Sequence, residues 1–160
     1  MAKGATTEIA FGALVFNVAA ELKEAPVEAI LVADGATGRE VLRILPHGND
    51  YYLFKPKALP PGAYDVAFLY RRCETPSKIA SGLDVAAGKE TVLTLDSGIV
   101  VSRPNGTRVR GWDLVPTGGG APALSIRRGF DNEEPLWRPF PVPPGTYDLI
   151  LKVNDMDEDL

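Results

Sequence analysis

Apolar and polar residues alternate along much of the chain, and turn-forming residues separate the alternating stretches every eight to twelve positions. In residues 64–70 every second side chain is a large apolar one, so a strand here has one apolar face. Residues 147–153 show the same alternation. One apolar face per strand is typical of antiparallel sheets that pack face to face. The pattern therefore predicts an all-β protein, with each of these two strands packing one side on a core.

Shorter runs predict the remaining strands. We expect them at residues 6–19 (one or two strands around Gly12), 27–33, 40–45, 50–54, 82–85, 90–95, 97–101, 108–115 and 123–127. Residues 19–25 favour a loop or a short helical turn, because Pro26 ends any helix after two turns.

The chain contains an internal repeat. Residues 54–66 return as residues 137–149 at a constant offset of 83, and residues 11–15 match 97–101 at an offset of 86. This predicts two domains: a first repeat, residues 1–96, and a second repeat, residues 97–160. The second repeat is incomplete at its C-terminal end, because nothing after Val153 matches residues 82–95.

Both copies carry the sequence Pro-Pro-Gly-x-Tyr-Asp, at residues 60–65 and 143–148. A type II turn takes proline and then a glycine with positive φ, so we expect Gly62 and Gly145 to have that conformation. A tyrosine at the start of a strand behind a turn is more often a corner anchor than a ligand contact. Tyr64 and Tyr147 are therefore expected to hydrogen-bond nearby backbone.

A domain that lacks a strand leaves backbone N–H and C=O groups unpaired along a sheet edge, and another chain can pair with them. Residues 6–10 precede Gly12 as residues 90–95 precede Gly98, so they are the counterpart of a strand that the second repeat lacks. They can close the second repeat within the chain or in a neighbouring subunit, or the edge can stay open. We favour pairing between molecules, which predicts a protein partner or self-association through an open sheet edge.

Composition narrows the classes of function. The chain has 160 residues and a net charge of −4, without the basic face of a nucleic-acid binder. No apolar run is long enough for a membrane span. The N-terminus has no signal-peptide core, and Cys73, the single cysteine, cannot form an intramolecular disulfide. Localisation stays open on these grounds.

Residues with potential chemistry are isolated in the sequence. His47 has no second ligand at zinc spacing, Cys73 has no histidine nearby, and the acidic residues at 155–159 lack the pattern of a calcium loop. We therefore expect no catalytic residue, no metal and no cofactor. Tyr51 and Tyr52 are adjacent on a predicted strand, so they face opposite ways and one is exposed. That tyrosine is the binding candidate, and carbohydrate is its ligand class.

The order of these motifs resembles the transthyretin-like, or carboxypeptidase-regulatory-like, repeats. The shared features are the Gly-Ile-Val-Val strand, Asp-Gly-x-Thr-Gly, Leu-Pro-Pro-Gly-x-Tyr-Asp-Val and Val-x-x-Gly-Lys-Glu-Thr-x-Leu-x-Leu. The resemblance implies two tandem transthyretin-like β-sandwich domains and a non-catalytic structural or protein-interaction module. It also implies a bacterial surface or exported protein, hence an extracytoplasmic location.

Hydroxyisourate hydrolases, an enzymatic branch of this fold, use several histidines and end in Tyr-Arg-Gly-Ser. This chain has only His47 and ends in Asp-Glu-Asp-Leu, which departs from that pattern.

Overall fold

The protein is described by a computed structural model that covers residues 8, 10–47, 52–73, 75–129 and 134–153. Within these residues the chain is all-β, without α-helix. Short 3-10 turns lie at η1 (Ala20–Glu24) and η3 (Glu134–Trp137). The all-β prediction is confirmed, and η1 occupies the segment before Pro26 where a short helical turn was one of the two expectations.

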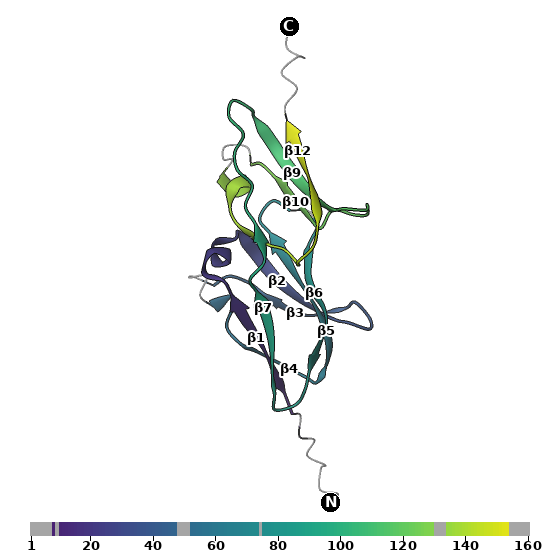
Figure 1. Ribbon diagram of the computed structural model, residues 1–160. Helices are drawn as coiled ribbons and strands as arrows, with labels where there is room; N and C mark the ends of the chain where they lie inside the picture. Colours follow the sequence, from purple (N-terminus) through teal and green to yellow (C-terminus); the bar gives the residue numbers. More distant parts are fainter. Residues whose placement is uncertain (1–7, 9, 48–51, 74, 130–133, 154–160) are drawn as a thin grey trace, which may run out of the picture.

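The first repeat forms two sheets that pack face to face (Figure 1). One has the order β4 (Lys57–Leu59), β1 (Gly12–Val18), β7 (Glu90–Leu95), and β1 and β7 run parallel. The other is antiparallel, in the order β3 (Glu40–Ile44), β2 (Val27–Asp34), β5 (Gly62–Tyr70), β6 (Ser77–Val85). Their inward residues, such as Leu14, Phe16, Val66 and Phe68, form the core.

The second repeat is built from smaller sheets. One consists of β11 (Phe140–Pro141) and β8 (Gly98–Ile99). The other has the order β10 (Leu124–Arg127), β9 (Val109–Pro116), β12 (Tyr147–Val153). Trp112 on β9 is fully buried, and its Nε1–H donates to the carbonyl of Leu136 at 2.9 Å.

The two repeats order their strands alike but end differently. The order β10-β9-β12 in the second repeat corresponds to β3-β2-β5 in the first, and β11-β8 corresponds to β4-β1. In the first repeat β6 pairs with the outer edge of β5, and β7 pairs with the outer edge of β1. Among the described residues no strand occupies either position in the second repeat. Both open edges therefore lie on the side where β6 and β7 close the first repeat.

The repeats share one continuous core at their junction. Tyr70, fully buried at the end of β5, packs edge-on against Phe140 with ring centroids 5.1 Å apart. Its hydroxyl donates to the carbonyl of Pro141 at 3.1 Å. Ser77 donates across the same junction to the carbonyl of Ala123 at 2.6 Å. The molecule is elongated, and β1 begins near one end while β12 finishes near the other (Figure 1).

Several predicted strands differ from the observed ones. Residues 52–54 of the strand expected at 50–54 form a turn, while 50 and 51 lie outside the described residues. β6 starts at Ser77, before the expected 82, because it pairs with β5 over nearly its whole length. β8 stops at Ile99, before the expected 101, because β11 offers it only two partners, Phe140 and Pro141.

Candidate functional site

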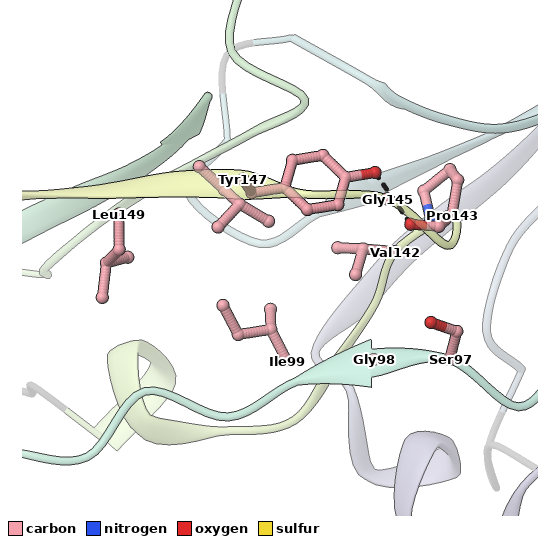
Figure 2. A pocket seen from close by; sticks show the side chains of 9 residues that line it. Ser97, Gly98, Ile99, Val142, Pro143, Gly145, Tyr147 and Leu149 are labelled. Carbon is pink, nitrogen blue, oxygen red and sulfur yellow. Dashed lines mark hydrogen bonds between the residues drawn. The ribbon is translucent and has the colours of Figure 1, made fainter. Parts of the chain in front are cut away.

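A groove whose side chains are mostly apolar opens between β8 and β12 in the second repeat. Its volume is about 260 Å³, and its lining comprises Ser97, Gly98, Ile99, Leu114, Val142, Pro143, Gly145, Tyr147 and Leu149. Ile99 and Val142 point into the space below β12, and Leu149 points down toward them (Figure 2). The counterparts of β8 and β12 in the first repeat, β1 and β5, have β7 and β6 paired to their outer edges.

A tyrosine corner fixes the start of β12 beside this groove. The hydroxyl of Tyr147 donates to the carbonyl of Pro143 at 2.7 Å (Figure 2), and Tyr64 donates to Pro60 at 2.8 Å in the first repeat. The prediction that both tyrosines bond nearby backbone is confirmed. This hydrogen bond fixes the conformation of residues 143–147, and β12 continues from there beside the groove.

The expected positive φ at Gly62 and Gly145 is wrong, since neither glycine has it. The tyrosine ring explains why small residues stand there. It folds back over the glycine to reach the proline carbonyl, and a Cβ on Gly145 would lie 3.2 Å from atoms of the Tyr147 ring. These glycines leave room for the ring and do not supply a left-handed turn.

The apolar face of β12 is exposed. Leu149, Leu151 and Val153 are 43%, 38% and 44% exposed, whereas the residues 83 positions earlier, Val66, Phe68 and Tyr70, are fully buried. The prediction that β12 packs this face on a core is therefore wrong, because among the described residues no strand pairs with β12 as β6 pairs with β5, and none pairs with β8 as β7 pairs with β1. Ile150, on the opposite face, is 49% exposed.

On the outer face, a buried carboxylate ties the three strands of the larger sheet together. Asp113 on β9 accepts from Ser125 Oγ at 2.5 Å and from Arg127 Nη1 at 2.7 Å, both on β10. Lys152 Nζ on β12 lies 2.8 Å from its other oxygen. Burial alone would raise the pKa of Asp113, but hydrogen bonds from Arg127, Lys152 and Ser125 outweigh it and lower the pKa to about 2. The cluster ties β12 to β9, along the edge of β12 opposite its free edge.

The outer face of β12 carries an acidic residue, Asp148, whose counterpart in the first repeat forms an ion pair. Asp65 on β5 lies 2.9 Å from Lys78 Nζ of the neighbouring strand β6. The hydrogen bond from Lys78, with a second from the N–H of Gly82, lowers the pKa of Asp65. Its equivalent on β12, Asp148, is exposed and has no such ion pair within the described part of the chain. The lysine of a neighbouring strand is what this position lacks.

The remaining candidate residues do not converge on one site. Tyr51 and the acidic residues 155–159 lie outside the described residues. Tyr52 is 49% exposed but stands in a turn rather than on a strand, with Lys55 Nζ 4.0 Å from its ring centroid. Cys73 is half-buried at the junction and donates to the carbonyl of Ser125 at 2.5 Å. His47 is exposed.

Within the described ranges, no group of three or more acidic, histidine or cysteine side chains is placed to hold a metal ion, and no helix is long and apolar enough to cross a membrane.

A second cavity, about 690 Å³, lies at the junction of the repeats. Basic and acidic side chains both line it, among them Lys23, Arg71, Glu134 and Arg138. Arg138 pairs with Glu24 at 3.6 Å and also with Glu134. These pairs join η1 to η3 across the junction, so a structural role accounts for them.

Comparison with known proteins adds no assignment: no family model, no curated protein and no solved structure matches the chain.

Proposed function

We propose that this protein is a non-catalytic protein-interaction module that binds an extended segment of a partner along β12. The observation that supports this most directly is the contrast between the two repeats. Equivalent apolar residues are fully buried on β5 and about two-fifths exposed on β12. A free strand edge beside an apolar groove is the arrangement used in β-strand addition, where backbone bonds give affinity and side-chain pockets give specificity.

The finer fold assignment belongs to the same proposal. We propose that both repeats are transthyretin-like sandwiches and that the second lacks the two strands corresponding to β6 and β7. The matching strand orders and the two tyrosine corners support this assignment. On this basis, a partner completes the second sandwich by supplying one or both strands.

The lining of the groove suits a peptide strand. It consists of aliphatic side chains, two glycines, one serine, one proline and one tyrosine whose hydroxyl already donates to the carbonyl of that proline, Pro143. Apolar side chains of an incoming strand would cover Leu149 and Leu151, and its backbone would pair with the edge of β12. The first contact removes apolar surface from water, and the second gives the backbone groups of the edge hydrogen-bond partners.

The test is binding of a peptide with the sequence of residues 77–95, the β6–β7 segment that closes the first repeat. A fluorescein-labelled peptide should show a saturable rise in anisotropy when dilute protein is added. Leu149→Lys should weaken binding roughly tenfold or more, because it puts a charge in the apolar groove. Val41→Lys is the matched control. Val41 is similarly exposed, at 42%, but it lies in the first repeat on β3, the edge strand of its sheet that is farthest from β6. Absence of saturable binding by the wild-type protein would overturn the proposal.

Carbohydrate binding through Tyr52 is the second candidate, because this aromatic ring is half exposed. A glycan array followed by titration of hits would show it. The candidate requires binding that Tyr52→Ala abolishes and that Leu149→Lys leaves unchanged.

A further inference from the structure

The sequence of β12 is complementary to itself when two copies run antiparallel. If Ile150 stands opposite Ile150 of a second copy, Leu149 faces Leu151, and Asp148 faces Lys152. The outermost pair is Tyr147 with Val153. We infer that the strand added to β12 is β12 of a second copy, which gives a homodimer with its twofold axis at Ile150. This rests on the proposed strand addition and names its partner.

The backbone of β12 is oriented for this pairing. The carbonyl of Thr146 accepts from the N–H of Thr117 at 2.9 Å, so residue 146 points toward β9. Successive residues of a strand direct their backbone groups to opposite edges, so those of Leu149 and Leu151 point to the free edge. In the inferred register these two residues face each other across the interface, and each pair exchanges both hydrogen bonds. Residues 147–153 contain no proline to interrupt the pairing.

The charges of the inferred register reproduce a pair already present in the first repeat. There, Asp65 takes its lysine, Lys78, from the antiparallel neighbour β6. Asp148 is the equivalent of Asp65, and an antiparallel second copy of β12 places Lys152 beside it. Lys152 already contacts Asp113, so its ammonium group is held on the face where Asp148 lies. Opposite charges directly across antiparallel strands are stabilising, and like charges are destabilising.

The direction of the added strand also matches the first repeat. β6 runs antiparallel to β5, as the second copy runs to β12. The two larger sheets of the second repeats would join into one sheet with the order β10-β9-β12-β12-β9-β10. A twofold interface of this kind is closed, so it produces a dimer and not a fibre. The exposed Ile150 side chains meet at the axis on the outer face.

The first test measures mass against concentration by sedimentation equilibrium. The wild type should shift from monomer to dimer as concentration rises. Ile150→Lys puts two ammonium groups at the axis and should raise the dissociation constant roughly tenfold or more. Val41→Lys should leave it unchanged. Fluorescence of the buried Trp112 shows that each variant is folded.

A charge exchange tests the register. Asp148→Lys and Lys152→Asp should each weaken self-association, because each places like charges opposite each other twice. Lys152→Asp also removes the pair with Asp113, so Trp112 fluorescence must first show that this variant is folded. An equimolar mixture of the two variants should restore a dimer, since every cross-strand pair is then opposite in charge.

A wild-type protein that stays monomeric up to about 1 mM would overturn the inference, and so would a dimer that survives Ile150→Lys or a mixture that does not associate. If such a protein still binds the 77–95 peptide, strand addition stands and only the second copy is excluded as its partner. If it neither dimerises nor binds the peptide, both proposals fail.

Discussion

Individual side chains determine the shape of the turns and the outer face of the second repeat. The tyrosine corners at Tyr64 and Tyr147 could be predicted, because all the residues that make them lie within five consecutive positions. The Asp113 cluster could not be predicted, because its partners Ser125, Arg127 and Lys152 come from two other strands. Only the register of β10 and β12 on β9 brings them together.

Replacing either corner tyrosine by phenylalanine should lower the free energy of unfolding by about 1 kcal/mol, because one hydroxyl-to-carbonyl bond is lost while the ring remains. Urea denaturation of Tyr64→Phe and Tyr147→Phe measures this. Two variants as stable as the wild type would show that the hydroxyls do not hold these turns.

Asp113 should make stability depend on pH in the acid range. Its pKa is about 2 in the folded protein against an ordinary 3.8, so the carboxylate stabilises the fold above pH 4. This contribution to the free energy of unfolding amounts to about 2 kcal/mol, and it is lost as the pH falls from about 4 toward 2. Denaturation of the wild type at several pH values between 5 and 2 should show the loss, and Asp113→Asn should lack it. Asp84→Asn, which changes an exposed carboxylate, should keep it.

At the scale of elements, the alternation of apolar and polar residues predicts those strands that have one buried and one exposed face. β7 spans residues 90–95 as predicted, because Leu93 and Leu95 point inward while Glu90 and Thr94 lie on the exposed face. β6 was recognised only in part, since Ser77 is a buried polar residue satisfied by Ala123 of the other repeat. The exposure of β12 could not be derived from its own sequence, because its pattern matches that of the buried strand β5. What differs is which strands stand beside it.

The two edges of β12 should differ in hydrogen exchange. In dilute protein the amide protons of Leu149 and Leu151, which point to the free edge, should exchange quickly, and those of Ile150 and Lys152 slowly. On β5, Val66 and Phe68 should be protected, because β6 pairs with that edge. At concentrations where the protein dimerises, Leu149 and Leu151 should become protected as well. Equal exchange along both edges of β12 would contradict the strand orientation.

In the whole molecule, Tyr70 joins two repeats of unequal completeness into one core. Its ring packs on Phe140, and its hydroxyl bonds Pro141 in a setting where burial raises the pKa of Tyr70 well above its ordinary value. A shared core makes the repeats unfold together, because neither can expose its end without opening the other.

The wild type should therefore show one calorimetric transition. Tyr70→Ala removes a fully buried ring at a cost of roughly 3–5 kcal/mol, and it should split the transition in two. The second repeat should melt first, since β12 has the more exposed apolar face. Phe16→Ala is the control, because it removes a buried ring that packs on Phe54 within the first repeat. It should lower the melting temperature without separating the transitions. A single transition in Tyr70→Ala would mean that contacts other than this ring couple the two repeats.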